Sequence, residues 1–343
     1  MKAFVMAAGV GTRLRPLTYS IPKPLVPVVN TPVIGHLLKN LVNHGINKII
    51  VNVHYYPKMI MSYLEDGKKW NMEIKYSYEK KLLGTAGGVK LKERFFDDTF
   101  VVTSGDGLSD INFSKLVSYH KSKKAIATIA LKSVDLKLDY GIVEIDKSFK
   151  VKKFVEKPSW NEMYSDYVNT GIYVFEQEIF KYIPKNVEYD FGKQLLPKLI
   201  EKGLPVYGYV MDEYWCDVGN LKEYKKSHHD CLDGKVKVVI PAEQVLPGVW
   251  IGRKTRMPRS VKVIPPVVVG KNVEFGRNSI IGKYSVVGDS SKFGNCVKIE
   301  DSVLWSRVCV KSKVNLTSCV IGSSAKVSES ISMFEGAVLN IKS

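Results

Sequence analysis

The sequence predicts an α/β fold with a Rossmann-like, mostly parallel sheet, followed by a short left-handed parallel β-helix. Two observations predict it. Short apolar runs alternate with helical patterns over residues 1–233, and apolar residues recur every six positions from Val269 onward. Strands that alternate with helices form parallel sheets covered on both faces, whereas apolar hexads build stacked triangular coils. We therefore expect two domains, residues 1–233 and residues 234–343.

Length and composition are those of a soluble globular protein. The chain has 343 residues, of which 45% are hydrophobic and 25% charged, enough for two domains with proper cores. No apolar run approaches the roughly 20 residues that span a bilayer, and Met1 leads directly into a core strand. We expect a cytoplasmic protein without a membrane partner.

The net charge bears on which ligands the chain binds, and the cysteine spacing bears on disulfides and zinc. The formal net charge is +17, but the chain has no nucleic-acid recognition motif, so we expect anionic small-molecule substrates and no nucleic acid. The five cysteines are scattered and lack C-x-x-C spacing, which argues against disulfides or a zinc site.

The first apolar run ends in a glycine-rich loop. Residues 3–8 read as a buried strand, and Gly9 and Gly11 follow, where the backbone can turn with positive φ. Glycines let backbone N–H groups converge on an anion, and Arg13 and Lys23 add positive charge. The spacing matches neither the dinucleotide-binding nor the Walker A motif. The loop predicts a polyphosphate site; the alternative is an ordinary turn with a surface arginine.

Further elements follow in order. A helix is predicted by an apolar stripe at helical spacing, made by Ile34, Leu37, Leu38, Leu41 and Val42. Strands are predicted over residues 48–53, 71–78, 99–104, 125–131 and 151–155.

Two motifs fall where strands end, which is where ligands bind in such sheets. Residues 83–88 are small, so that a flat base could approach the backbone closely. Residues 101–107 form an apolar strand that ends in Gly-Asp, and a carboxylate at Asp106 beside a phosphate loop suits Mg²⁺. Taken singly, each motif also fits an ordinary turn or helix cap.

The segment Gly9-Val-Gly-Thr-Arg-Leu-Arg-Pro-Leu-Thr18, followed by Pro22-Lys-Pro24, resembles the signature of the nucleoside-diphosphate-sugar pyrophosphorylases, also called sugar-1-phosphate nucleotidylyltransferases. Within that family the chain is most similar to the mannose-1-phosphate guanylyltransferase branch, over nearly its whole length. The resemblance implies a nucleotide-diphospho-sugar transferase fold, with catalysis in residues 1–233. Many members carry a β-helix like the one predicted for residues 234–343.

The resemblance also implies the site residues. Nucleotide binding is expected from Ala8, Gly9, Gly11, Thr12, Arg13, Glu79, Gly84 and Thr85. Leu82 departs from the family pattern, in which proline is frequent. Sugar-phosphate binding is expected from Gly141, Glu156, Lys157, Asn169 and Thr170. The catalytic set is Arg13, Lys23, Asp106 and Asp217, and of these Asp106 and Asp217 are expected to hold the cofactor Mg²⁺.

The six-residue repeat predicts the second domain. Its inward apolar positions are Val269, Phe275, Ile281, Val287, Phe293 and Ile299, and the residues four places further on are Val273, Ser279, Ser285, Ser291, Val297 and Val303. The register breaks after Lys311 and resumes near Ile321, which suggests two to four coils. No histidine lies beyond His229, so acyl transfer in this domain is not expected; a role in self-association or in steadying the catalytic domain is.

Together these features predict transfer of a nucleotidyl group from an NTP to a sugar 1-phosphate, giving an NDP-sugar and pyrophosphate. Two segments, residues 156–160 ending in Trp160 and residues 169–173, resemble those of the mannose-1-phosphate guanylyltransferase branch. Their sequences therefore favour GTP and mannose 1-phosphate by resemblance. Glucose 1-phosphate with another NTP is the alternative. A non-catalytic regulatory subunit is a second alternative, although the charged site residues are all present. We expect a homo-oligomer without mutase activity.

Overall fold

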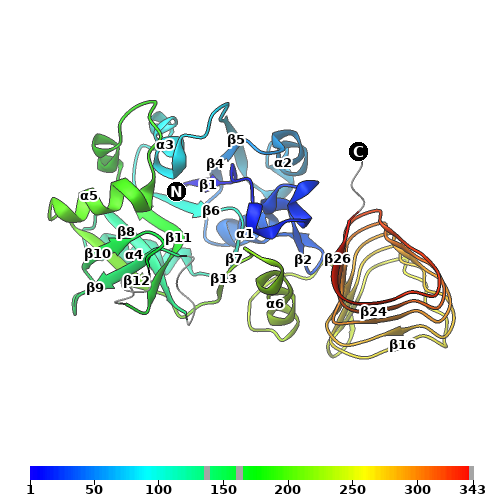
Figure 1. The fold of residues 1–343 in the computed structure, drawn as a ribbon. Coiled ribbons are helices and arrows are strands. Elements are labelled where there is room, and N and C mark those ends of the chain that lie inside the picture. The colour runs from blue at the N-terminus through cyan, green and yellow to red at the C-terminus, as the bar shows by residue number, and fades with distance from the viewer. Residues whose placement is uncertain (135–139, 160–164, 340–343) are drawn as a thin grey trace. The chain divides into compact units, whose positions relative to one another are not determined.

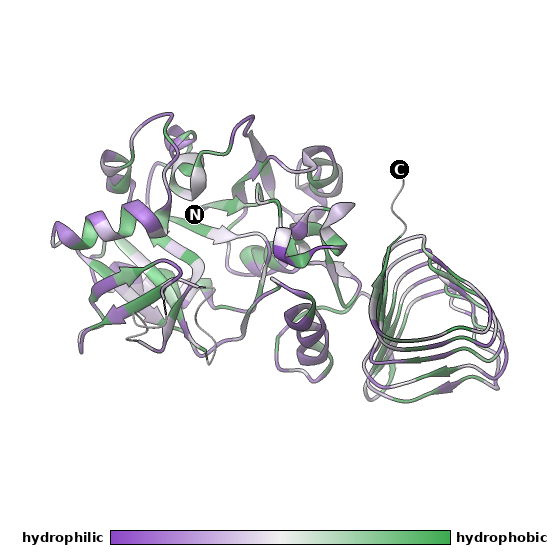
Figure 2. Cartoon of the chain, in the orientation of Figure 1, coloured by the Kyte–Doolittle hydropathy of each residue, from purple (hydrophilic) through white to green (hydrophobic). Residues whose placement is uncertain are grey.

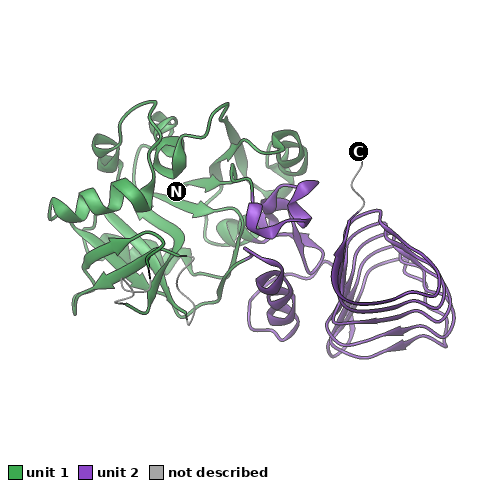
Figure 3. Cartoon of the chain, in the orientation of Figure 1, with its two compact units in different colours: residues 1–10, 37–217 green, residues 11–36, 218–343 purple. Residues whose placement is uncertain are grey.

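The computed structural model describes residues 1–134, 140–159 and 165–339 (Figure 1). The chain divides into two compact units (Figure 3). The first comprises residues Met1–Val10 and Leu37–Asp217, and the second comprises Gly11–His36 and Val218–Ser343. The sequence predicts a single domain boundary between residues 233 and 234, which differs from the boundaries of these two compact units. The predicted domain boundary stays a prediction. Within the described residues, no helix is long and apolar enough to cross a membrane.

A parallel sheet forms the core of the first unit. Its parallel strands, in spatial order, are β5 (Glu73–Tyr78), β4 (Lys48–Val53), β1 (Lys2–Met6) and β6 (Phe100–Ser104). In β1 and β6 three successive residues are fully buried, as expected for strands covered on both faces. Figure 2 shows these strands as mainly hydrophobic. The predicted α/β fold is confirmed.

An antiparallel strand extends this sheet. β11 (Tyr167–Phe175) pairs antiparallel with β6, with β8 (Ala127–Ser133) and, at one residue, with β9 (Ile142–Ile145). β10 (Val151–Val155) pairs antiparallel with β9, and β12 (Val206–Val210) runs parallel to β8. A separate ladder joins β7 (Gly107–Ser109) to β13 (Trp215–Asp217).

Helices accompany the sheet. They are α1 (Val33–Asn43), α2 (Pro57–Leu64), α3 (Gly84–Lys90), α4 (Phe113–Ser122) and α5 (Leu196–Glu201). The predicted stripe of α1 is buried, apart from the half-buried Val42. Asn112 caps α4, because its side chain accepts the Lys115 N–H at 3.0 Å. Aromatic rings fill the first unit's core; Phe100, for example, stacks on Phe96 with ring centroids 4.2 Å apart.

The second unit contains the predicted β-helix, drawn as stacked coils in Figure 1. All twelve repeat positions named from the sequence are buried. Its strands run from β14 (Glu243–Leu246) to β26 (Ser332–Val338). Between them lie β15 (Val249–Ile251), β16 (Lys262–Val263), β17 (Val267–Val269), β18 (Ile280–Ile281), β19 (Ser285–Val287), β20 (Lys292–Phe293), β21 (Lys298–Glu300), β22 (Val303–Leu304), β23 (Cys309–Val310), β24 (Asn315–Ile321) and β25 (Lys326–Val327).

The number of coils is larger than the sequence suggested. On one face six strands pair in succession, namely β15, β17, β19, β22, β24 and β26, so the expectation of two to four coils was wrong. Early coils advance by 18 residues, as from Val249 to Val267, and later ones by 17, as from Val303 to Val320. One residue is lost from each later coil while parallel pairing continues. A strict hexad pattern therefore misses the later coils.

The shortened coils are joined to α6 (Leu221–Leu232) by a polar cluster at Asp301. One Asp301 oxygen accepts from Lys225 Nζ at 2.7 Å and from Ser318 Oγ at 2.5 Å, while the other lies 2.6 Å from His229 Nε2. Nearby, the Trp305 indole N–H donates to the Tyr224 hydroxyl at 2.8 Å. Polar and aromatic contacts thus hold the helix against one corner of the coils.

A buried histidine on α6 has surroundings that disfavour its charged form. His228 is 1% exposed, and its Nδ1 accepts the Val29 N–H at 3.3 Å. Burial lowers the pKa of His228 to about 3, with smaller contributions from His229 and His36. The native state therefore keeps this imidazole neutral.

We expect this histidine to destabilise the protein in acid. The unfolded state binds a proton near the ordinary pKa of about 6.5, so the free energy of unfolding falls as pH drops from there toward 3, by up to about 1.4 kcal/mol per pH unit. His228→Asn keeps an acceptor for Val29 and removes this proton. Urea denaturation between pH 5 and pH 8 should show a shallower pH dependence in the variant. Equal slopes would contradict the assignment.

Candidate functional site

A pocket of about 280 Å³ lies in the first unit, at the carboxyl ends of the parallel strands. Six predicted nucleotide or metal residues line it, namely Ala8, Gly9, Glu79, Gly84, Thr85 and Asp106. Leu82, the departure from the family pattern, also lines it. Residues from separate motifs therefore meet at one cavity, as the parallel arrangement predicts.

Four other lining residues were not predicted from the sequence. They are Met6, Asn52, Ser104 and Asp190. The first three lie at the carboxyl ends of the adjacent strands β1, β4 and β6: Met6 and Ser104 are the last residues of β1 and β6, and Asn52 is the second-last residue of β4. Met6 pairs with Asn52 on one side and with Ser104 on the other. A signal for Asn52 existed, since it is a polar residue that interrupts the apolar run of residues 49–53 in β4. No motif marked Asp190.

Glu79 stabilises the wall of the pocket through hydrogen bonds. It is 2% exposed, and its two oxygens accept from Asn52 Nδ2 at 2.8 Å and from the Leu83 N–H at 3.1 Å. The Asn52 amide oxygen in turn accepts the Ala7 N–H at 2.7 Å. A Cβ on Gly88 would lie 2.7 Å from Glu79 Oε1, so this position excludes a side chain. Glu79 thereby ties the loop after β1 to the start of α3.

The segment before residue 190 brings Asp190 to the same wall. Gly84 has φ +71°, and a Cβ there would lie 2.6 Å from the Tyr189 carbonyl oxygen. The Tyr189 N–H donates to the Leu83 carbonyl at 2.9 Å. Thr85 Oγ1 then donates to Asp190 Oδ2 at 2.8 Å. The glycine lets two distant segments pack backbone to backbone, which is why the sequence pattern did not reveal Asp190.

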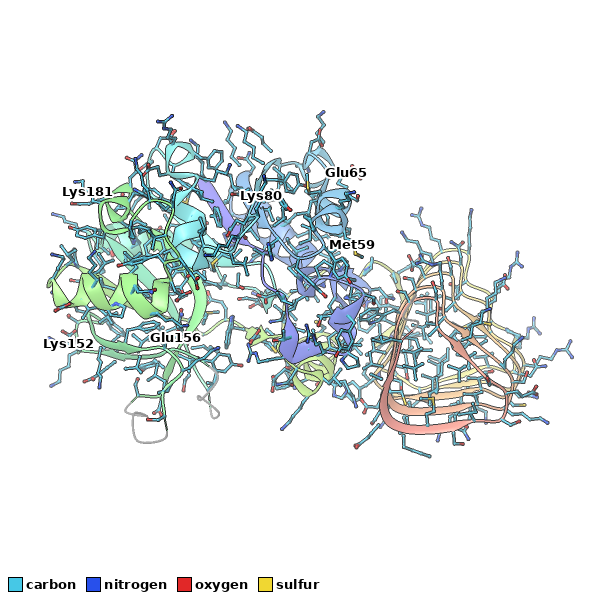
Figure 4. All side chains as sticks on the ribbon, turned by 45° about the horizontal axis from the view of Figure 1, so that its top comes forward. Met59, Glu65, Lys80, Lys152, Glu156 and Lys181 are labelled. Carbon is cyan, nitrogen blue, oxygen red and sulfur yellow. The ribbon has the colours of Figure 1, made fainter. Side chains whose placement is uncertain are left out.

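Glu156, from the predicted sugar-phosphate group, lies in a glycine-lined recess. A Cβ on Gly141 would come within 2.8 Å of Glu156 Oε2, and one on Gly192 within 2.6 Å. Burial, and then the charge of Asp190, raise the pKa of Glu156, while Lys157 and Lys193 oppose them. In Figure 4, Glu156 lies further inside the first unit than the exposed Lys152 and Lys181. Asp190 thus acts electrostatically on Glu156 while also lining the pocket at the strand ends.

The other predicted sugar-phosphate residues occupy β11 and the turn after β10. Asn169 donates through Nδ2 to the Tyr173 hydroxyl at 2.7 Å, and its N–H donates to the Gly141 carbonyl at 2.8 Å. The Thr170 hydroxyl is buried and donates to the Ala130 carbonyl at 2.7 Å. Lys157 is exposed, with φ +50°. Trp160 lies outside the described residues.

The two predicted metal ligands lie at one end of the short β7–β13 ladder. Asp217, the last residue of β13, pairs with Gly107, the first residue of β7, and Asp106 immediately precedes Gly107. Antiparallel partners lie about 4.5–5.5 Å apart at Cα, so the ladder places Asp217 beside Gly107, the residue directly after Asp106. Ser104 Oγ donates to Asp106 Oδ1.

The remaining predicted residues, Gly11, Thr12, Arg13 and Lys23, belong to the second unit. Gly11 has φ +69°, and a Cβ there would lie 2.9 Å from Lys23 Cβ, so the glycine and the buried lysine are packed together. The Gly11 carbonyl accepts from Thr18 Oγ1 at 2.8 Å. Arg13 is exposed. A single residue, Val10, separates Gly11 from the pocket residue Gly9 in the sequence.

The raised pKa of Glu156 predicts a stability cost at neutral pH. A carboxyl whose folded pKa lies above its unfolded value destabilises the native state when ionised, and this cost disappears as pH falls below the unfolded value. We expect Glu156→Gln to raise Tm at pH 8, with the gain shrinking toward pH 4. Glu144→Gln, on the exposed part of β9, is the matched control and should leave Tm nearly unchanged. A lower Tm for Glu156→Gln at pH 8 would contradict this account.

Comparison with known proteins identifies the family. A model described as nucleotidyl transferase matches residues 2–234. The UTP–glucose-1-phosphate uridylyltransferase of Synechocystis sp. is 41% identical over 304 residues, covering 79% of this chain and 78% of that protein. The mannose-1-phosphate guanylyltransferase of Mycobacterium tuberculosis is 34% identical over 234 residues, covering 68% and 65%. The structure of HddC from Yersinia pseudotuberculosis in complex with GMP-PN matches with a TM-score of 0.58 at 25% identity, covering 67% and 99%. These findings confirm the predicted resemblance: the chain belongs to the nucleotidyl transferase family.

Proposed function

We propose that this protein transfers a nucleotidyl group from an NTP to a hexose 1-phosphate, releasing pyrophosphate and forming an NDP-sugar. The observation that carries the proposal is the position of Asp106 and Asp217 at the same end of the β7–β13 ladder, with Asp106 on the wall of the pocket at the strand ends. Membership of the nucleotidyl transferase family supports the reaction class.

In this reaction an oxygen of the sugar phosphate attacks the α-phosphorus of the NTP, and the bond to pyrophosphate breaks. Catalysis of such a step is mainly positioning and charge stabilisation. Gly9 and the wall around Glu79, Gly84 and Thr85 receive the nucleotide, because small residues there leave the backbone accessible. Lys157 offers the cationic side chain that suits the phosphate of the sugar.

The pyrophosphate is assigned to the loop between Gly9 and Lys23. Gly11, Thr12 and Arg13 supply backbone N–H groups and a guanidinium, the groups that recognise phosphate oxygens. Lys23 adds a cation that is only 7% exposed. A buried lysine packed against Gly11 is held rigidly, which suits the stabilisation of charge that grows on the leaving group.

Asp106 and Asp217 fit a Mg²⁺ site through the chemistry of their donor atoms. Mg²⁺ prefers oxygen ligands and is commonly held by one or two carboxylates together with substrate phosphates. Within the described part of the chain, no cluster of three or more His, Cys, Asp or Glu residues is placed to hold a metal. Two carboxylates that share the ion with substrate match this composition. When bound, the ion neutralises phosphate charge.

Glu156 and Asn169 are assigned to sugar hydroxyls. The glycine recess around the Glu156 carboxylate excludes other side chains, which leaves its position well defined. Asn169 is oriented by its bonds to Tyr173 and to the Gly171 N–H, the latter at 3.1 Å. A carboxylate and an amide whose positions are fixed by neighbouring groups can discriminate hydroxyl stereochemistry.

For the substrate pair, glucose 1-phosphate with UTP is the first candidate and mannose 1-phosphate with GTP the second. The first is favoured by the uridylyltransferase relative, which is 41% identical and covers 79% of the chain. The second is favoured by relatives named mannose-1-phosphate guanylyltransferase, which are 32–36% identical.

We expect pyrophosphate release with Mg²⁺ in a grid of four NTPs against glucose, mannose and galactose 1-phosphates. One strong combination identifies the substrates. A maximum with UTP and glucose 1-phosphate would support the first candidate, and one with GTP and mannose 1-phosphate the second. If folded protein releases no pyrophosphate in any combination, the proposed activity is wrong.

Removing either carboxylate should abolish most turnover. We expect Asp106→Asn and Asp217→Asn each to lower kcat by at least about a hundredfold, the scale of losing one preorganised electrostatic group. Asp212→Asn, at an exposed aspartate five residues before Asp217, is the matched control and should retain activity. Steady-state kinetics at saturating Mg²⁺ measures the effect. Near-normal kcat in both variants would contradict the metal assignment.

A further inference from the structure

A second cavity, of about 620 Å³, lies entirely within the second unit, between α6 and the corner of the shortened coils. Nothing in the proposed reaction uses it. Its volume is within the range of small-molecule sites, roughly 300–1,000 Å³. Its lining combines lysine side chains with apolar and small residues. Such a lining suits a ligand that has both an anionic group and an apolar part.

One wall is a basic face of α6. Lys222, Lys225, Lys226 and His229 all line the cavity. Their spacing of three, four and seven residues places them on one side of the helix. Leu221 adds an apolar group at the start of the same helix. Four nitrogen-bearing side chains therefore face one space.

The opposite wall is formed by the corner where each coil has lost a residue. Ser318, Val320, Glu335 and Gly336 line it. Ser318 and Glu335 both have positive φ, of 57° and 46°, and they follow Asp301 at intervals of 17 residues. A Cβ added to Gly336 would meet no atom within 4 Å, so the space beside this glycine is open.

The cavity lining carries more positive than negative charge. It contains three lysines and one carboxylate, Glu335. Behind the lining, Asp301 pairs with Lys225 and Asp230 pairs with Lys226, each at 2.7 Å. Lys222 is exposed and makes no ion pair with any carboxylate in the described residues. An anion could therefore bind Lys222 without breaking an existing ion pair.

We propose that this cavity binds a phosphorylated small molecule with an apolar body. The phosphate would contact Lys222 and the neighbouring lysine heads, as charge-assisted hydrogen bonds favour. The apolar body would lie against Leu221 and Val320, beside Gly336. Such a ligand bridges α6 and the β-helix within the second unit. The site shares no lining residue with the nucleotide pocket of the first unit.

Calorimetric titration of the full chain tests the proposal with three probes, namely phenyl phosphate, inorganic phosphate and phenol. We expect phenyl phosphate to bind more tightly than inorganic phosphate or phenol, because only phenyl phosphate has both a phosphate group and an apolar ring. Lys222→Glu should weaken binding of phenyl phosphate by at least about tenfold, the effect of losing one charge-assisted contact. Gly336→Leu should weaken it similarly by filling open space.

Matched variants separate this site from the proposed catalytic one. Lys58→Glu is the control for Lys222→Glu, because Lys58 is also exposed and is likewise the second residue of its helix, α2. Arg13→Ala removes a proposed pyrophosphate contact. Both should bind phenyl phosphate as the unaltered chain does. Thermal denaturation should show that all four variants remain folded.

Three results would overturn the proposal. One is unchanged binding in both Lys222→Glu and Gly336→Leu. Another is loss of binding in Arg13→Ala, which would place the probe at the proposed catalytic site. The third is equal affinity for phenol and phenyl phosphate, which would show that the cavity does not select an anion. Because the titration measures binding and not turnover, failure of the proposed reaction would leave its outcome interpretable.

Discussion

Parallel pairing of β1 with β4 and β6 is the constraint on which the candidate site depends. The pairing runs without a shift, so Met6, Asn52 and Ser104 lie side by side at the carboxyl ends of their strands. The segments after β1, β5 and β6 carry the predicted residues Ala8, Glu79 and Asp106. Since carboxyl ends of parallel strands meet at one edge, residues 8, 79 and 106 reach one pocket although they are far apart in sequence.

Glycines determine how closely the surrounding segments approach this pocket. Gly84 and Gly88 allow close packing against Tyr189 and Glu79, and Gly141 and Gly192 enclose Glu156. The same close packing removes Glu156 from water and raises its pKa. The recess that fixes the position of the Glu156 carboxylate therefore also destabilises its charged form.

In the second unit, the repeat length and the inward apolar residues determine how the coils pack. Its coils pair every 17 or 18 residues, and inward apolar residues keep each coil in register. Loss of one residue per coil at the Asp301 corner changes the surface without interrupting the ladders. α6 packs on that corner through Asp301 and Tyr224, and the second cavity lies beside these contacts.

The sequence alone determined the fold class, the repeat and most residues of the pocket, because these are local patterns: apolar runs, hexads and glycine motifs. Through resemblance, the sequence also indicated Asp106 and Asp217 as candidate metal ligands. Only the tertiary structure revealed Asp190, the Glu79–Asn52 bracing, the later coils and the basic cavity on α6. Each of these depends on backbone segments that are distant in the chain. Asp190 reaches the pocket because residues 83–87 pair with residues 187–189, and no periodicity within either segment encodes that approach.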